Sequence, residues 1–255
     1  MKKALILYWH GLGDVIMLTP HLRHLYQKGY KIDLMCRIQV VESHLLDSCP
    51  YIDKLIEVEN PWELVSGKLR SPAGFRKQAN VNIAQFEKLR KNYDWSGVSL
   101  HERPFLQSHK IDMTSHELGL EIEDKKLEVF IPKSAEQEAK KYIDGDFIFI
   151  HTMPKPHIYH AWDATQWIRE NLPPLKTINT GWGADHFMAF DDINTAFAIM
   201  QRARYRVLSS SVFVHACEAM GCTIDVINYG RLDRKVWPLN QSKVLHIREE
   251  SKWIK

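Results

Sequence analysis

Two patterns of apolar positions alternate along the chain, and their alternation predicts strands and helices in regular succession. Residues 4–9 form a continuous apolar run that is followed by Gly11 and Gly13. Such a run is typical of a strand buried on both faces, as in a parallel sheet. Residues 15–28 carry apolar side chains at mostly helical spacing, and we expect Pro20 to kink or restart that helix.

The same rhythm continues through the first half and begins again near residue 147. Strands that alternate with helices predict parallel sheets with right-handed crossovers. The two series predict two open α/β domains, residues 1–133 and 134–255. The other expected strands are 31–35, 54–58, 98–100, 147–150, 176–179, 205–208 and 223–228. The other expected helices are 40–46, one that ends near 89, 105–120, 134–142, 164–170, 194–203 and 212–220.

The composition is that of an ordinary globular protein. Of the 255 residues, 45% are hydrophobic and 25% are charged, which excludes a disordered or collagen-like chain. A net charge of +3 permits an anionic partner without requiring one. The four cysteines form no C-x-x-C pair, so we expect reduced thiols. No apolar stretch approaches the roughly 20 residues of a membrane span, and we therefore expect a cytoplasmic protein without a transmembrane segment.

The first candidate site is the turn Gly11-Leu12-Gly13-Asp14, between the first expected strand and its helix. Glycines in such a turn let the backbone approach a ligand, and a helix N-terminus favours anions. A dinucleotide fingerprint is disfavoured, because Ile16 replaces its third glycine and Arg37 follows the second strand in place of an acid. Asp14 has two interpretations, a helix cap or a general base in a cleft.

Two segments of the second half also carry candidate chemistry. Ser209, Ser210 and Ser211 lead from a strand into a helix, which provides either an anion site or a structural cap. His151 opens a proline-containing loop with two more histidines, and their spacing matches no zinc pattern. We therefore expect a loop that lines a ligand cleft, and no metal.

The residues from Gly11 to Leu25, with a Gly-Asp pair, a Thr-Pro pair and an amphipathic helix, resemble the opening of the heptosyltransferase family, glycosyltransferase family 9. The second half is similar in order: a loop leading to Trp162, a Gly-x-Gly turn with Asp185, then a loop and helix carrying His215. The resemblance implies a GT-B fold, in which two Rossmann-like open parallel-sheet domains face each other across a cleft. It implies an acceptor-binding first domain and a second domain that binds the nucleotide-sugar.

The resemblance further implies a glycosyltransferase that works with inversion, without a metal or another cofactor. Its donor would be a nucleotide-diphosphate sugar, and its acceptor an anionic saccharide of the glycan or lipopolysaccharide kind. Asp14 matches the family's proposed base. The candidate donor-binding residues are Lys155, Asp185, Ser210, Ser211, Val212, His215 and Arg231.

The stretch from Lys68 to Lys91 is rich in basic residues and suits an anionic acceptor, or else a solvated helix face. The expected acceptor-binding residues are Gly13, Lys77, Lys88 and Lys91. Two other functions stay open. One is sugar transfer to modified bases of DNA. The other is a non-catalytic module that binds nucleotide-sugars or polyanions, because Ser210-Ser211-Val212 stands where the family has Asp-Ser/Thr-Gly.

Overall fold

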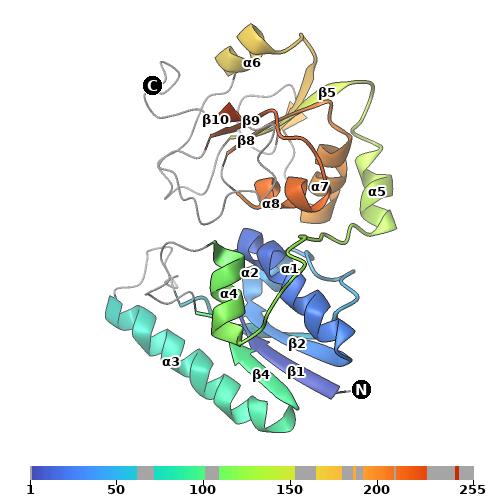
Figure 1. Cartoon of the computed structure of the whole chain (residues 1–255). Coiled ribbons are helices and arrows are strands. Elements are labelled where there is room, and N and C mark those ends of the chain that lie inside the picture. Colours follow the sequence, from blue (N-terminus) through green and yellow to red (C-terminus); the bar gives the residue numbers. More distant parts are fainter. Residues whose placement is uncertain are drawn as a thin grey trace. The chain divides into compact units, whose positions relative to one another are not determined.

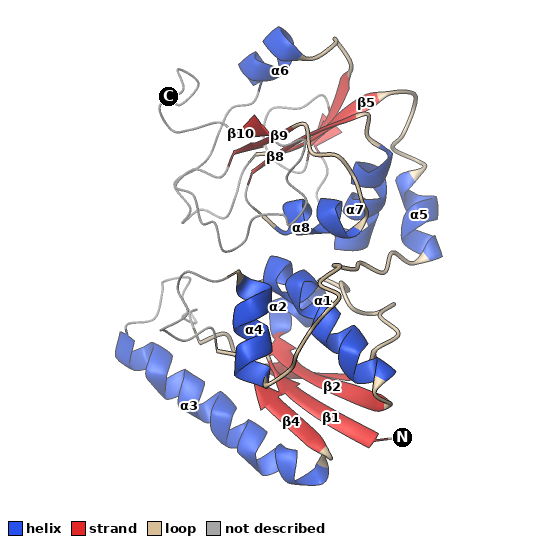
Figure 2. Ribbon diagram, viewed as in Figure 1, coloured by secondary structure: helices blue, strands red, loops and turns tan. Residues whose placement is uncertain are grey.

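The computed structural model describes residues 2–61, 72–100, 109–152, 165–179, 186–187, 192–209, 211–228 and 245–246. The chain divides into two compact units, Met1–Lys126 and Leu127–Lys255. Each unit is built around a parallel sheet with helices packed on it (Figure 1, Figure 2). The division lies before helix α5 (Lys133–Ala139), whereas the sequence predicted a boundary between residues 133 and 134.

The first unit has its strands in the order β3-β2-β1-β4. The chain extends the sheet from β1 through β2 to β3, and then returns to pair β4 with the other side of β1. The switch point of this sheet therefore lies between β1 and β4. The strands are β1 (Lys2–Leu7), β2 (Tyr30–Arg37), β3 (Ile52–Val58) and β4 (Trp95–Val98). The helices are α1 (Leu12–Gln27), α2 (Ile38–Glu42), α3 (Pro72–Leu89), the 3-10 helix η1 (Arg90–Asn92) and α4 (Lys110–Leu118).

Helices cover both faces of this sheet, which explains the continuous apolar run of β1. On one face Leu5 and Leu7 pack with Ala79 and Phe86 of α3. Helices α1 and α4 lie on the side of the sheet away from α3 (Figure 1). The apolar residues of β1, 4–7, are all fully buried. Helix α3 is longer than the helix that the sequence predicted to end near residue 89. Its apolar side chains form a single narrow stripe on an otherwise polar helix, so the sequence pattern did not reveal its first turns.

Helix α1 runs through Pro20 without a break, so the expected restart does not occur. Proline has no N–H, and Pro20 therefore cannot donate to the carbonyl of Ile16, four residues earlier. The hydroxyl of Thr19 donates to that carbonyl at 2.7 Å. The Thr-Pro pair thus supplies the hydrogen bond that its own proline removes, and the helix continues.

The second unit has its strands in the order β10-β9-β8-β5-β6-β7, and its switch point lies between β5 and β8. Among the described residues, no helix of either unit is long and apolar enough to cross a bilayer. The strands are β5 (Phe147–His151), β6 (Lys176–Asn179), β7 (His186–Phe187), β8 (Tyr205–Ser209), β9 (Val226–Asn228) and β10 (Leu245–His246). The helices after α5 are α6 (Thr165–Asn171), α7 (Ile193–Arg202) and α8 (Val212–Ala219).

Candidate active site

Asp14 lies in the first turn of α1, at the carboxyl end of β1 and beside the switch point of the first sheet. Gly11 is the N-cap residue of the helix, and Asp14 is the third residue after it. The Oδ2 atom of Asp14 accepts a hydrogen bond of 3.0 Å from the Gly11 N–H, which is one half of a capping box. Asp14 therefore caps the helix from within its first turn, and Gly13 lies partly buried in that same turn. Ligands of open α/β sheets bind at this edge.

Lys110 places a positive charge directly on this carboxylate. Its ammonium group, from the first turn of α4, forms an ion pair with Oδ1 of Asp14. The two side chains are only 23% and 16% exposed, so water screens the pair weakly. Lys110 was missed by the sequence analysis. The usable signal is that its helix follows β4, the strand across the switch point from Asp14.

Arg37 is a second cation near the same turn, and it is 6% exposed. Its Nη2 atom lies 3.7 Å from the point where a Cβ atom on Gly11 would stand, and Oδ2 of Asp14 lies 3.4 Å from that point. A Cβ atom at position 11 would therefore be in van der Waals contact with both charged groups. Arg37, which argued against a dinucleotide site, in fact approaches the candidate site.

His10 is the neutral member of this group. Its Nε2 atom lies 3.0 Å from the carbonyl oxygen of Ser99, the residue that follows β4. Burial lowers the pKa of His10 to about 4, and nearby Lys110 lowers it too, while Asp14 opposes the shift. At neutral pH the imidazole is therefore uncharged. These groups place one carboxylate in an ion pair with a lysine, and an arginine near the same turn, an arrangement chemically suited to accept a proton from a hydroxyl and to hold an anionic group nearby.

In the second unit, the N-terminus of α8 lies at the switch point. The Ser211 hydroxyl oxygen accepts a hydrogen bond of 3.3 Å from the Phe213 N–H, so the predicted structural cap is confirmed for Ser211. Ser209 donates from its hydroxyl to the carbonyl of Thr152 at 3.1 Å, which ties the end of β8 to the residue after β5. Val212 follows as the first residue of the helix. A capped helix N-terminus of this kind is also a favourable position for an anion.

Two imidazoles complete this region. The ring of His151, at the end of β5, lies 4.4 Å from the ring of Phe213, centroid to centroid. Burial lowers the pKa of His151 to about 4, so it is neutral at pH 7. His215 lies in α8 about one turn after Ser211 and is buried. Four predicted donor-binding residues, Lys155, Asp185, Ser210 and Arg231, lie outside the described residues.

The predicted acceptor-binding lysines lie on α3 and η1, and all are exposed. Helix η1 leads into β4, and the Asp94 carboxylate accepts a hydrogen bond of 2.7 Å from the Lys3 N–H at the start of β1. Lys88 and Lys91 therefore lie at the amino edge of the sheet, about 20 Å of strand away from the edge that carries Asp14. Lys77 lies closer to the start of α3, which follows the carboxyl end of β3. The structure does not bring Lys88 and Lys91 together with Asp14.

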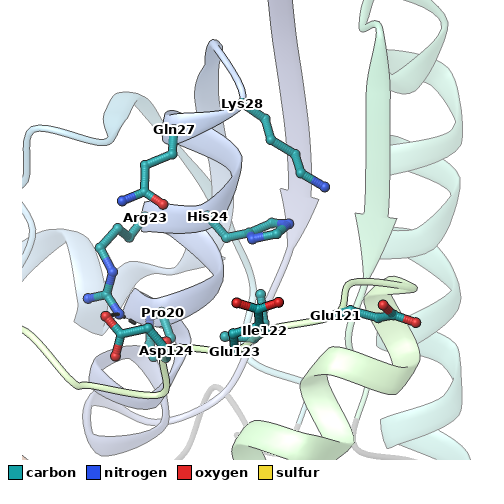
Figure 3. A pocket seen from close by; sticks show the side chains of 9 residues that line it. All are labelled: Pro20, Arg23, His24, Gln27, Lys28, Glu121, Ile122, Glu123 and Asp124. Carbon is teal, nitrogen blue, oxygen red and sulfur yellow. Dashed lines mark hydrogen bonds and ion pairs between the residues drawn. The ribbon is translucent and has the colours of Figure 1, made fainter.

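A pocket of about 430 Å³ opens beside the second half of α1 (Figure 3), and Asp14 is not among the residues that line it. The Arg23 guanidinium binds the Asp124 carboxylate at 2.9 Å and donates to two backbone carbonyls of the segment after α4. Burial and Lys28 lower the pKa of His24, which also lines the pocket. These contacts fasten the segment to α1. The lining residues are Pro20, Arg23, His24, Gln27, Lys28, Glu121, Ile122, Glu123 and Asp124.

Within the described part of the chain, no three or more His, Cys, Asp or Glu side chains are grouped so that they could hold a metal ion. His157 and His160, which accompany His151 in the sequence, lie outside the described residues.

Solved structures with a similar fold include several glycosyltransferases. A family 9 glycosyltransferase from Veillonella parvula is 17% identical with a TM-score of 0.64, over 97% of this chain and 86% of that one. The Escherichia coli heptosyltransferase WaaC, solved with ADP-2-deoxy-2-fluoro heptose, is 13% identical with a TM-score of 0.61. The match covers 96% of this chain and 93% of WaaC. TibC of Escherichia coli, an iron-containing dodecameric glycosyltransferase, is 9% identical with a TM-score of 0.56. The match covers 92% of this chain and 60% of TibC.

No protein-family model and no curated protein matches the chain by sequence. The structural likeness confirms the predicted α/β, GT-B type fold and the resemblance to glycosyltransferase family 9 at the level of the fold. It covers nearly the whole chain, and therefore both units.

Proposed function

We propose that this protein is a glycosyltransferase that moves a sugar from a nucleotide-diphosphate sugar to an acceptor hydroxyl, with inversion and without a metal ion. The fold shared with glycosyltransferases supports this class of reaction. The observation that carries the proposal is the Asp14 carboxylate, held by Gly11 and Lys110 at the switch point of the first sheet.

Asp14 would act as the general base. Each carboxylate oxygen has two lone pairs, so the bonds to Gly11 and Lys110 leave acceptor capacity for an acceptor hydroxyl. As the hydroxyl proton passes to Asp14, the acceptor oxygen attacks the anomeric carbon from the face opposite the diphosphate. The bond from that carbon to the diphosphate oxygen breaks, and the diphosphate leaves with the electron pair. General-base catalysis of this kind contributes about 10²–10⁴-fold in rate.

The second unit would bind the donor. The N-terminus of α8, with Ser211, Val212 and the nearby His215, offers hydrogen-bond donors and a helix dipole to the diphosphate. Lys155, Asp185, Ser210 and Arg231 belong to this proposal as further donor contacts. The structures of WaaC and TibC were solved with ADP-linked heptoses, which makes an ADP-sugar the first donor to test.

The acceptor would be anionic and held by the first unit. The first unit would supply positive charge near Asp14 from Lys110 and Arg37, and from Lys77 at a greater distance. Gly13 would let the acceptor approach the backbone closely. We include a cytoplasmic location in the proposal, since all four cysteines are reduced thiols.

A donor screen tests this function. Thermal unfolding is followed with ADP-, UDP-, GDP- and CMP-sugars, and the donor that stabilises the protein is then assayed for release of its nucleoside diphosphate with anionic saccharide acceptors. We expect one nucleotide class to stabilise the fold and to turn over, with a rate that excess EDTA leaves unchanged. Binding without turnover would instead identify a nucleotide-sugar-binding module, whose altered loop at Ser211 and Val212 has lost catalysis. A steep salt dependence with a DNA acceptor would favour the DNA-modifying alternative.

A further inference from the structure

Two of the four cysteines meet at the end of α8, away from its N-terminus. Cys217 belongs to the last turns of the helix, and Cys222 directly follows Gly221, which has a φ of +67°. The Cys222 N–H donates to the Cys217 carbonyl at 2.9 Å, and the Gly221 N–H donates to the Glu218 carbonyl at 3.0 Å. These two hydrogen bonds and the left-handed glycine define a Schellman motif.

A Schellman motif brings together the side chains of its first and last residues, which are usually both apolar. Here both residues are cysteines, and the Cys217 thiol donates to the Sδ atom of Met200 at 3.5 Å. Backbone dimensions and the 2.9 Å hydrogen bond hold the two Cα atoms within about 6.8 Å of each other. That separation lies within the range that a disulfide can span. The turn therefore places the two Cα atoms at a separation that a disulfide can span, without any rearrangement of the helix backbone.

The two thiols differ in accessibility and in acidity. Cys217 is fully buried, whereas Cys222 is partly exposed, so a reagent in solution meets Cys222 first. The neighbouring Cys217 thiol lowers the pKa of Cys222 to about 7, and burial raises the pKa of Cys217 well above its ordinary value. At neutral pH a substantial fraction of Cys222 is thus thiolate, the form that attacks disulfides. By contrast, burial raises the pKa of Cys36 to about 12.

We propose that Cys217 and Cys222 are a redox-active dithiol that closes to an intramolecular disulfide by exchange with low-molecular-weight disulfides of the glutathione type. The Cys222 thiolate attacks one sulfur of oxidised glutathione and releases one glutathione thiolate. Cys217 then gives up its proton and attacks the Cys222 sulfur of the mixed disulfide, which releases the second glutathione. The protein pair is oxidised by two electrons, and one glutathione disulfide is reduced to two thiols.

The proposal is independent of the glycosyltransferase activity, because neither thiol belongs to the candidate site. The disulfide would join the C-terminal end of α8 to the segment that leads into β9, while the N-terminal turn at Ser211 lies at the other end of the helix. The disulfide would link two residues whose backbones are already hydrogen-bonded to each other, so we expect the fold of the second unit to be retained.

To test the proposal, the full-length protein is equilibrated at pH 7 in glutathione buffers of increasing oxidised fraction. Each sample is then quenched in acid and alkylated, and its mass is measured by mass spectrometry. We expect two of the four thiols to become resistant to alkylation, without a lasting glutathione adduct. Proteolysis after Glu218 separates the two cysteines, so a disulfide between them shows as two fragments joined until reduction. Retention of all four thiols in the most oxidising buffer, or accumulation of glutathione on Cys222, overturns the proposal.

Variants sharpen the same measurement. Cys217→Ser should stop at the mixed disulfide on Cys222, and Cys222→Ser should lose no thiol. Cys49→Ala, which leaves the pair intact, should still lose two. In the wild type, the alkylation rate of Cys222 should be half-maximal near pH 7, and in Cys217→Ala, which removes the neighbouring thiol, this midpoint should move up by more than about one pH unit. An unchanged midpoint would contradict the influence of Cys217 on Cys222, and wild-type mapping alone decides the matter if a variant fails to fold.

Discussion

The carboxyl edges of the two sheets have the same topology but present different side chains. In the first unit the switch point between β1 and β4 gathers charged groups, the Asp14 carboxylate with Lys110 and Arg37. In the second unit the corresponding point between β5 and β8 presents hydroxyls and imidazoles, from Ser209, Ser211 and His151, at the start of a helix.

This difference matches two different tasks. A proton acceptor must be ionisable and held at a fixed position, which a carboxylate bound to a backbone N–H and a lysine achieves. A site for a nucleoside diphosphate needs hydrogen-bond donors without a negative charge, and a helix N-terminus supplies them. Under the proposed function, one architecture, repeated in the chain, would supply an acid–base edge and an anion-binding edge. The following predictions test that division.

The largest effect is expected for Asp14→Asn. The amide is nearly isosteric and its oxygen can still accept from the Gly11 N–H, but it cannot take up a proton from the acceptor. We expect sugar transfer to fall by about 10²–10⁴-fold, with donor affinity nearly unchanged. Initial rates of nucleoside-diphosphate release and calorimetric donor binding measure the two quantities.

The matched control is Asp94→Asn at the amino edge of the same sheet, where the carboxylate likewise accepts a backbone N–H. It should leave the rate unchanged. Wild-type turnover in Asp14→Asn would reduce Asp14 to a helix cap and remove the acid–base half of the comparison.

The second prediction concerns the uncharged edge. Ser211→Asp keeps a good N-cap residue but places a carboxylate where a diphosphate would bind, so we expect diphosphate affinity to fall by at least about tenfold. Ser211→Asn is the neutral control, because it caps equally well and should bind within a few-fold of wild type. Calorimetry with the nucleoside diphosphate gives the affinities, and thermal unfolding checks that both variants fold. Equal affinities for all three proteins would place the diphosphate elsewhere.

Acidification should distinguish the two units by stability. Burial lowers the pKa of His10 and His21 in the first unit, and of His151 in the second, to about 4. The unfolded chain protonates histidine near pH 6.5, so it binds more protons than the folded state between about pH 6.5 and 4. Stability is therefore retained above that window and falls as the pH decreases through it, by at most about 1 to 2 kcal/mol per histidine between pH 7 and 5.

Hydrogen exchange of peptides from β1 and β5 at the two pH values measures this loss in each unit. We expect β1 to lose more protection than β5, since two of these three histidines lie in the first unit. His151→Asn should remove most of the pH dependence of β5 and leave that of β1 as it was. Earlier loss of protection in β5 would show that other groups control acid stability.

The two edges were not equally predictable from the sequence. Asp14 and Ser211 follow apolar strands directly, so local pattern was sufficient to place them at a carboxyl edge. Lys110 reaches Asp14 across 96 residues, and only the pairing of β4 with β1 brings it there. Arg37 was noticed for the wrong reason, because its approach to Gly11 depends on the pairing of β2 with β1. Strand order, which a local pattern does not encode, decides such contacts.

The basic stretch shows the same limit. Its basic residues suggested one acceptor surface. However, helix α3 has 18 residues and runs from one edge of the sheet toward the other, so the lysines along it do not share an edge. At about 1.5 Å per residue, Lys77 and Lys88 are separated by roughly 16 Å along α3.

The smallest effect is expected for the lysines of α3 and η1, and the change in acceptor KM should depend on where each lysine lies. Lys77→Ala should raise the acceptor KM by about two- to threefold and flatten its salt dependence, since exposed charges act over about 8–10 Å at physiological salt. The double variant Lys88→Ala/Lys91→Ala, at the amino edge, should leave both unchanged, and donor KM should stay constant throughout. Acceptor kinetics at about 50 and about 300 mM salt, roughly threefold below and twofold above physiological ionic strength, measure the difference. If the double variant has the larger effect, the acceptor extends over the amino edge, as a long polyanion such as DNA would. If neither variant changes KM, the helix face is solvated and the cations beside Asp14 alone hold the acceptor.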